Sequence, residues 1–256
     1  MTEPAGEGPA LELVGLVKEF RGRRVVHGLS LTVPRGLLYG LVGPNGAGKT
    51  TTLSMATGLL RPDAGTARVL GHDVWADPAS AKAVMGVSPD GMQLFEQLSG
   101  RELLTYVGAL RRMPRDVTAA RAAELLTVLD LADDASTVVA DYSAGMVKKI
   151  SLAAALIHAP RLLVLDEPFE AVDPVSSQTI RTILRRYVAS GGTVVLSSHV
   201  MELVEGLCDR VAVIAGGRVL AEDTVAGLTR GGTLHERFLE LVGASDVGGE
   251  GLAWLG

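Results

Sequence analysis

Residues 43–50 read Gly-Pro-Asn-Gly-Ala-Gly-Lys-Thr and match the pattern G-x-x-x-x-G-K-[ST] at every defined position. Glycines let the backbone turn so that successive N–H groups point at phosphate oxygens. Lys49 adds a positive charge for the β- and γ-phosphates, and the hydroxyl of Thr50 can ligate Mg²⁺. The pattern therefore predicts a triphosphate-binding loop, with nucleotide contacts from Gly43, Pro44, Asn45, Gly46, Ala47, Gly48, Lys49, Thr50 and Thr51.

Two adjacent acids, Asp166 and Glu167, follow the apolar run Leu162–Leu165. A strand that ends in Asp166 places a carboxylate where it can hold the shell of a magnesium ion. The next residue, Glu167, lies where it can polarise an attacking water. Adjacent acids are usually only solvated charges, but together with the phosphate loop they favour hydrolysis of the bound triphosphate.

His199 follows the strand-like segment 193–198. Because the carboxyl ends of parallel strands line the crevice of an open α/β sheet, a histidine there can reach a γ-phosphate and respond to its loss. The four other histidines lack such support and are interpreted as surface or packing residues.

A second anion-binding surface is predicted at Tyr142-Ser143-Ala144-Gly145-Met146, where a long helix begins. The hydroxyl of Ser143 and the helix N-terminal amides near Gly145 suit a phosphate. One molecule has no obvious need for two phosphate-binding surfaces, so two molecules arranged head to tail could each cover the other's nucleotide. Asp173, before Pro174, is by itself a helix N-cap but can also lie beside the catalytic water or at a subunit contact.

Size and composition fit one α/β domain with a subdomain, since the chain has 256 residues, of which 47% are apolar. The net charge of −5 and the lack of a basic stripe argue against nucleic acid as a partner. A single cysteine allows no internal disulfide and favours a reducing cytosol. The N-terminus does not read as a signal peptide, and the longest apolar stretch, 150–159, falls short of the ~20 residues of a membrane span.

The periodicity of apolar residues predicts an α/β fold of the P-loop NTPase type, with a mainly parallel sheet and an antiparallel β-subdomain. A helical insertion is expected at about 87–158. From the capping box Ser99–Glu102 to about residue 158 the pattern is helical throughout, with Leu103, Leu104, Val107 and Leu110 on one face. The predicted strands are 11–20, 24–33, 36–42, 66–70, 85–89, 161–166, 193–197 and 211–214, and the last begins a hairpin that extends to residue 221. Flexible tails are expected at 1–9 and 244–256, around a domain at 10–243.

In order and spacing, these motifs resemble the nucleotide-binding subunit of an ABC (ATP-binding cassette) transporter, from about Leu11 to Val242. The resemblance makes residues 43–50 the Walker A loop, Leu162–Asp166 the Walker B strand, residues 170–173 the D-loop and His199 the switch histidine. It implies that Phe20 stacks on adenine and that ATP and Mg²⁺ are the cofactors. It also implies catalytic roles for Glu167, His199 and Lys49, metal contacts from Thr50, Asp90 and Asp166, and phosphate contacts across a dimer from Ser143 and Gly145.

Two positions depart from the commonest pattern of that family. The signature Leu-Ser-Gly-Gly-Gln reads Tyr-Ser-Ala-Gly-Met at 142–146, and the Q-loop glutamine is replaced by Asp90. Since an ionised aspartate is shorter and only accepts hydrogen bonds, its contact to Mg²⁺ is expected to run through water. Asp90, the ending 234–242 and the single cassette are most similar to the bacterial exporter branch, which includes drug- and antibiotic-export ATPases.

The resemblance implies an ATPase that powers an exporter through a separate transmembrane permease subunit. It would be cytoplasmic, held on the inner face of the cell membrane by that permease, with ATP between two cassettes of a homodimer or heterodimer. A soluble ABC-type ATPase acting on ribosomes or DNA is the alternative, although such relatives carry two cassettes or long coiled coils. An importer is the closer rival, but would often add a regulatory domain beyond residue 240. A GTPase or a small-molecule kinase is disfavoured because the chain lacks an Asn-Lys-x-Asp motif.

Overall fold

The computed structural model describes residues 8–91 and 94–242. The N-terminal part forms a four-stranded antiparallel sheet, the β-subdomain, in the order β2-β1-β4-β5. Its long hairpin arises from alternating apolar residues, so that Leu11, Leu13 and Leu16 of the first strand are buried. The bounds are β1 Leu11–Phe20, β2 Arg23–Val33, β4 Ala64–Val69 and β5 His72–Asp73.

The larger sheet has six strands in the order β10-β9-β3-β8-β7-β6. Neighbouring strands are parallel except for the hairpin β9–β10, which confirms the predicted mainly parallel sheet. Every residue of its three central strands is buried, as expected for continuous apolar runs covered on both faces. The bounds are β3 Leu38–Val42, β6 Met85–Ser88, β7 Leu162–Leu165, β8 Thr193–Ser198, β9 Arg210–Ala215 and β10 Arg218–Thr224.

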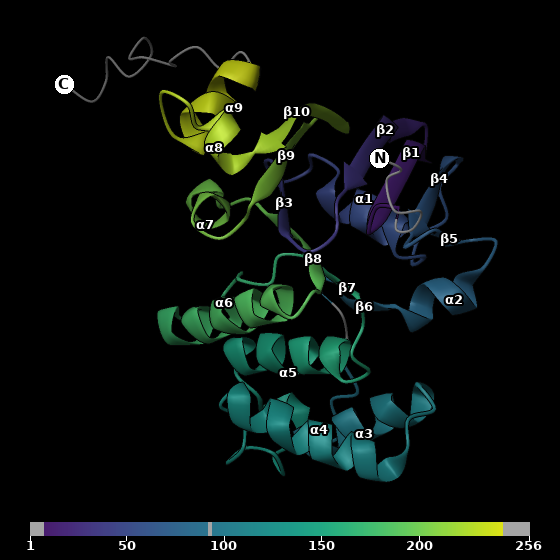
Figure 1. The fold of residues 1–256 in the computed structure, drawn as a ribbon, viewed down its shortest axis with the longest axis vertical. Coiled ribbons are helices and arrows are strands. Elements are labelled where there is room, and N and C mark those ends of the chain that lie inside the picture. The colour runs from purple at the N-terminus through teal and green to yellow at the C-terminus, as the bar shows by residue number, and fades with distance from the viewer. Residues whose placement is uncertain (1–7, 92–93, 243–256) are drawn as a thin grey trace, which may run out of the picture.

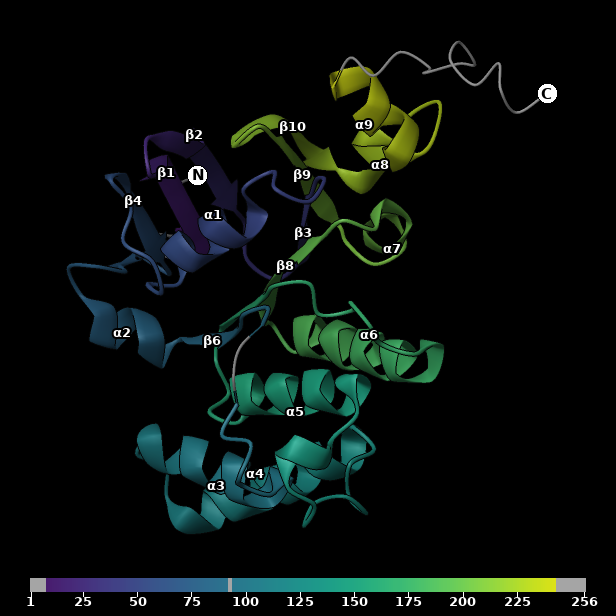
Figure 2. The same ribbon diagram turned by 180° about the vertical axis from the view of Figure 1, so that it is seen from behind.

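Helices surround the large sheet and form the lower half of the molecule in Figure 1. Those outside the insertion are α1 Lys49–Ala56, α2 Pro78–Ala83, α6 Pro174–Ala189, α7 Met201–Glu205, α8 Val225–Leu228 and α9 Leu234–Val242. The helical insertion contains α3 Gly100–Leu110, α4 Arg115–Val128, a short 3₁₀ turn at Val139–Asp141 and α5 Ala144–Leu156. Viewed from behind, α5 again lies between α6 and the pair α3–α4 (Figure 2).

On the predicted apolar face of α3, Leu103 and Leu104 are buried, whereas Leu110, the last residue of the helix, is 63% exposed. The predicted capping box is present, with Ser99 Oγ accepting from the Glu102 amide and the Glu102 carboxylate accepting from the Ser99 amide.

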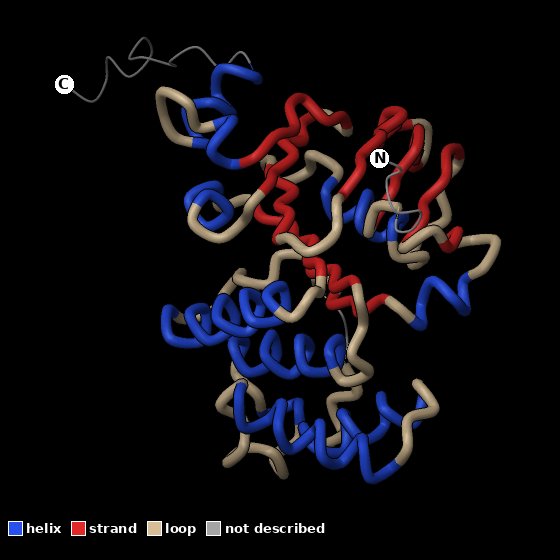
Figure 3. Tube along the Cα trace, in the orientation of Figure 1, coloured by secondary structure: helices blue, strands red, loops and turns tan. Residues whose placement is uncertain are grey.

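Figure 3 shows the strands in the upper and middle parts of the trace, whereas in the insertion α3, α4 and α5 are joined by loops. Within residues 8–91 and 94–242, no helix is both long and apolar enough to cross a membrane. The flexible tails predicted at 1–9 and 244–256 lie outside the described residues, apart from Gly8 and Pro9.

Candidate nucleotide-binding site

The phosphate loop joins the end of β3 to the start of α1. Gly48 is the N-cap of α1 and has φ 101°, a left-handed conformation that glycine adopts without a steric cost. At Gly43 the backbone passes so close to β9 that a Cβ would collide with the carbonyl of Ile214. These two glycines therefore fix the path of the loop, so that the N-terminus of α1 faces the space that the loop encloses.

Lys49, the first residue of α1, is buried, with 5% of its surface exposed. Its Nζ donates to the carbonyl oxygens of Gly43 at 2.7 Å and Pro44 at 3.3 Å. It also lies 3.4 Å from Glu167 Oε1. The charge is thus held inside the loop, where the low dielectric strengthens its attraction for an anion.

Glu167 lies just beyond β7 and has a φ of 46°, which is uncommon for a residue with a side chain. Its backbone N–H donates to Ser197 Oγ at 2.9 Å. Its carboxylate contacts Lys49 through Oε1 and His199 Nδ1 through Oε2, the latter at 3.0 Å. Since an ionised carboxylate only accepts, Nδ1 of His199 carries a proton in this arrangement.

Asp166 is the other member of the acidic pair and is also buried. Its amide donates to the carbonyl of Ser88 on β6, and its Oδ1 accepts from Ser197 Oγ. Ser197 on β8 therefore contacts both acids. Sequence reasoning missed this serine, although a polar residue inside a fully buried strand, two positions before His199, was an available signal.

A cavity of about 350 Å³ lies between these elements. It brings together Asn45–Thr51 of the loop with Asp90, Glu167 and His199, and also Val25 and Glu170, which sequence reasoning did not select. Gly43, Pro44 and Asp166 do not line it, although Lys49 donates to the carbonyls of Gly43 and Pro44, and Asp166 shares Ser197 with Glu167. Phe20, Ser143, Gly145 and Asp173 are not among its described lining residues.

Phe20 ends β1 and is 44% exposed. The Nζ of Lys18 lies 5.5 Å from the centroid of its ring, and the same lysine pairs with Asp63 at 2.8 Å. The ring is thus accessible at the rim of the β-subdomain, as a stacking residue must be.

Ser143, Gly145 and Asp173 form a separate cluster at the N-termini of α5 and α6. Ser143 Oγ accepts from the amide of Met146, and Asp173 Oδ1 accepts from the amides of Val175 and Ser176. A Cβ on Gly145 would lie 3.3 Å from Asp173 Oδ2. Hydrogen bonds, above all from Ser176, lower the pKa of Asp173, so the carboxylate is ionised at neutral pH. Both predicted helix caps are present, outside the cavity that holds Lys49.

Asp90 meets a basic partner that sequence reasoning did not select. Lys148 Nζ on α5 lies 3.0 Å from Asp90 Oδ1 and 3.0 Å from the carbonyl oxygen of Glu167. Lysines on helices are usually solvated, and no local pattern marks this one. The contact depends on packing between α5 and the loops that follow β6 and β7.

The oxygen atoms available at this site suit magnesium, an ion that is seldom held by protein ligands alone. The described residues contain no group of three or more His, Cys, Asp or Glu side chains arranged to hold an ion. Mg²⁺ commonly takes one or two carboxylates and completes its shell with water and substrate phosphates. The Thr50 hydroxyl and the carboxylates of Asp166 and Asp90 suit that role.

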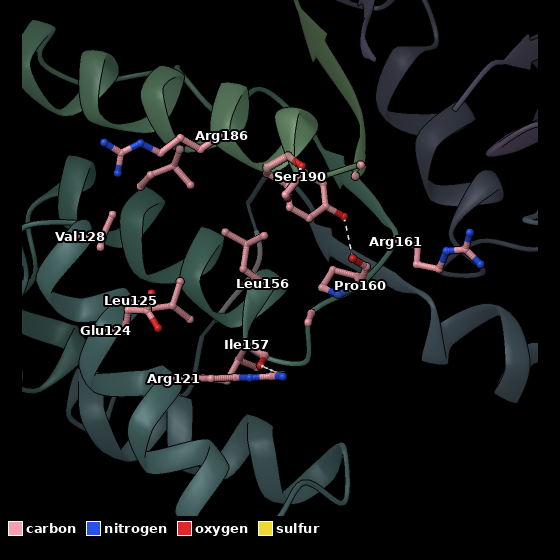
Figure 4. A pocket seen from close by; sticks show the side chains of 15 residues that line it. Arg121, Glu124, Leu125, Val128, Leu156, Ile157, Pro160, Arg161, Arg186 and Ser190 are labelled. Carbon is pink, nitrogen blue, oxygen red and sulfur yellow. Dashed lines mark hydrogen bonds between the residues drawn. The ribbon is translucent and has the colours of Figure 1, made fainter. Parts of the chain in front are cut away.

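A different cavity, of about 640 Å³, lies between α4, α5 and α6 (Figure 4). Arg121 donates to the carbonyl of Ile157 there at 3.0 Å, and Tyr187 donates to the carbonyl of Pro160 at 2.9 Å. It contains none of the phosphate-loop residues or catalytic candidates, so it does not belong to the site described above.

Fold and site define a P-loop nucleoside triphosphatase with a helical insertion. The family model described as "ABC transporter" matches residues 26–170, more than half of the chain. The chain belongs to the ABC transporter family. A solved structure described as the ATP-binding subunit of an ABC transporter superposes with a TM-score of 0.84 at 28% identity, covering 91% of this chain and 99% of that one.

Curated relatives point to one branch of the family. The daunorubicin/doxorubicin resistance ATP-binding protein DrrA of Streptomyces peucetius is 43% identical over 86% of this chain and 66% of its own length. The Nod factor export ATP-binding protein I of Rhizobium sp. (strain N33) is 41% identical over 83% of this chain and 70% of its own. The chain thus spans about two thirds of the length of these relatives. It is an ATP-binding and ATP-hydrolysing subunit of the exporter branch.

Proposed function

We propose that this subunit powers export by closing with a second cassette around ATP and Mg²⁺ and reopening after hydrolysis. The observation that carries the proposal is the placement of Glu167, whose carboxylate faces the cavity between the ammonium of Lys49 and the imidazole of His199. A carboxylate so placed can orient a water and accept its proton.

Each side chain has a distinct part in the proposed reaction. The loop amides and Lys49 bind the β- and γ-phosphates, and Phe20 stacks on the adenine. Glu167 orients the attacking water, while His199 holds the glutamate and contacts the γ-phosphate. Thr50 and Asp166, with Asp90 through water, would hold Mg²⁺, which when bound would supply charge neutralisation at the phosphates.

A second cassette is needed because Ser143 and Gly145 do not line the cavity of their own chain. Their helix N-terminus offers amides and a hydroxyl, which are groups that suit a phosphate. We infer that this surface completes the site of a facing cassette, with Asp173 at the contact between the two. The facing cassette is a second copy of this chain or a different one.

The permease is proposed to contact the surface near the start of the insertion. Phe95 is 55% exposed and Tyr106 of α3 is 39% exposed, and their rings meet edge to face with centroids 4.8 Å apart. Leu110 lies on the same helix and is also exposed. Exposed aromatic groups of this kind are typical of protein contacts. Because this segment follows Asp90 directly, movement at the nucleotide would reach it.

This permease would hold the subunit on the cytoplasmic face of the membrane and would select the cargo. Co-purification from the native membrane tests this partner. A protein with several membrane spans is the expected companion, whereas ribosomes or DNA in its place would contradict the assignment to transport.

Replacing Glu167 with glutamine tests the proposed chemistry. The E167Q variant should hydrolyse ATP about 10²–10⁴-fold more slowly, because an amide cannot accept the proton of the water, while its affinity for ATP stays near that of the wild type. Glu170→Gln is the matched control, since Glu170 lines the same cavity from the same loop but has no contact with Lys49 or His199. Wild-type turnover in E167Q, or equal losses in both variants, would remove Glu167 from this role.

A further inference from the structure

Lys148 lies on the second turn of α5 and contacts two loops of the nucleotide site at once. Its Nζ is 3.0 Å from the carboxylate of Asp90, in the loop after β6, and 3.0 Å from the carbonyl oxygen of Glu167, in the loop after β7. The lysine side chain is only 20% exposed. It therefore joins three segments that lie far apart in the sequence.

The contact with Glu167 is made at a constrained part of the backbone. Glu167 has a φ of 46°, in the left-handed region that side chains rarely favour. Its N–H is held by Ser197 Oγ at 2.9 Å, and its carbonyl is held by Lys148 and by the amide of Glu170 at 3.2 Å. Side chains from β8 and α5 thus fix the peptide groups on both sides of this residue.

This backbone conformation determines where the carboxylate points. With the peptide groups fixed, the side chain of Glu167 reaches Lys49 and His199 at the cavity. Without the contact to α5, the loop that carries Glu167 would be free to shift, and the carboxylate would move with it. Sites built to hold a reacting group tolerate such strain where neighbouring groups over-determine the conformation.

Asp90 gives the lysine its counter-charge. A partly buried ammonium that bonds only to a neutral carbonyl is poorly compensated, and an ionised carboxylate at 3.0 Å removes that penalty. The acidic residue at position 90 is therefore matched by a basic one at position 148, through a contact that sequence spacing does not reveal.

We propose that Lys148 is a positioning residue for the catalytic glutamate. Neutralised by Asp90, its ammonium holds the Glu167 carbonyl and so fixes the direction of the carboxylate. This inference rests on the proposed role of Glu167. Since Ser143, at the start of α5, is also proposed to meet the nucleotide of the facing cassette, the helix links that contact to the glutamate of its own chain.

Substitutions at Lys148 test the inference. Lys148→Met keeps the length of the side chain but removes its charge and donors. It should lower kcat by about 10- to 100-fold, because a displaced reacting group loses rate steeply, while KM for ATP changes by less than about threefold. Lys148→Arg, which restores the charge and the donors, should recover kcat to within about threefold of the wild type. Lys82→Met, an exposed lysine of α2, is the control and should behave like the wild type.

Hydrogen exchange of the nucleotide-free protein supplies a readout that does not depend on turnover. The amide of Glu167 should exchange faster in K148M, since the loop that presents it to Ser197 is released on one side. The amides of β3 should exchange as in the wild type. If K148M does not fold, Lys148→Leu, which likewise carries neither charge nor donor, takes its place with the same expectations.

Unchanged kcat in K148M, equal losses of kcat and of ATP affinity, or unchanged exchange at Glu167 would each overturn the inference. E167Q separates this failure from that of the proposed function. An inactive E167Q beside a fully active K148M contradicts only the role of Lys148, whereas an active E167Q contradicts the function itself.

Discussion

Ser197 connects the two acids of the site. Its Oγ accepts from the Glu167 amide and donates to the Asp166 carboxylate, and the residue is completely buried. Both acids thus depend on one hydroxyl for their orientation. An unsatisfied carboxylate and an unsatisfied amide would remain if it were removed.

We expect Ser197→Ala to lower kcat by about tenfold or more and the free energy of unfolding by about 1–3 kcal/mol, because two buried groups lose their partner. Steady-state ATP hydrolysis and urea unfolding measure the two effects. Ser198→Ala is the control: Ser198 is buried beside it, but bonds only with the backbone of Val200. Equal turnover in the two variants would show that the Ser197 hydroxyl does not organise the acids.

Residues at strand ends could be predicted from the sequence, whereas residues that reach the site through packing could not. Lys49, Asp166, Glu167 and His199 each follow a recognisable strand or loop pattern, because the parallel sheet brings its carboxyl ends together. Lys148 carries no such signal, since only the packing of α5 decides which loops it meets.

The junction between the insertion and the sheet is formed around the carbonyl of Met85 on β6. His158, just after α5, contacts that oxygen through Nε2 at 3.1 Å, and Arg111, after α3, also donates to it. Burial, with the nearby charge of Arg111, lowers the pKa of His158 to about 4. The histidine is therefore neutral in the folded protein at pH values where it is charged when unfolded.

This junction predicts a loss of stability in mild acid. Between pH 6.5 and 4 the unfolded chain binds a proton at His158 that the folded chain does not. The contribution of the neutral histidine to the free energy of unfolding is therefore present above pH 6.5 and is lost as the pH falls. Urea unfolding at pH 7 and pH 5 should show an extra loss of about 1–2 kcal/mol in the wild type relative to His158→Gln. The glutamine can still donate to the Met85 carbonyl but does not titrate. Identical pH dependence in the two proteins would contradict the neutral histidine.

The predicted strands agree with the observed ones to within about two residues at each end, but β5, α2 and α7 were not predicted, and the insertion differs from its prediction. The stretch from Ser99 to about 158 was predicted as helical throughout, but the structure divides it into α3, α4, a 3₁₀ turn and α5. Leu110 continues the helical spacing of apolar residues but is exposed, because tertiary packing and not spacing decides which residues are covered. Periodicity thus identifies the type of an element better than the surface that it buries.

The molecule as a whole carries two half-sites that do not meet. The cavity with Lys49 and Glu167 is the proposed triphosphate site, and the cluster of Ser143, Gly145 and Asp173 lies outside it. A single copy therefore has both parts of a site but no complete site. We propose that a facing cassette supplies the missing half.

Mixing two inactive variants tests that claim most directly. Lys49→Ala removes the ammonium proposed to bind the phosphates but keeps Ser143 at the N-terminus of α5. Ser143→Asp keeps a good helix cap but directs a negative charge at the facing triphosphate, leaving its own phosphate loop intact.

Neither variant should hydrolyse ATP alone, because each pair then has only defective sites. An equimolar mixture should regain activity, since a mixed pair contains one intact site, formed by the loop of one copy and the α5 N-terminus of the other. A mixture that stays inactive, or a Ser143→Asp protein that hydrolyses ATP like the wild type, would contradict completion of the site by a second copy.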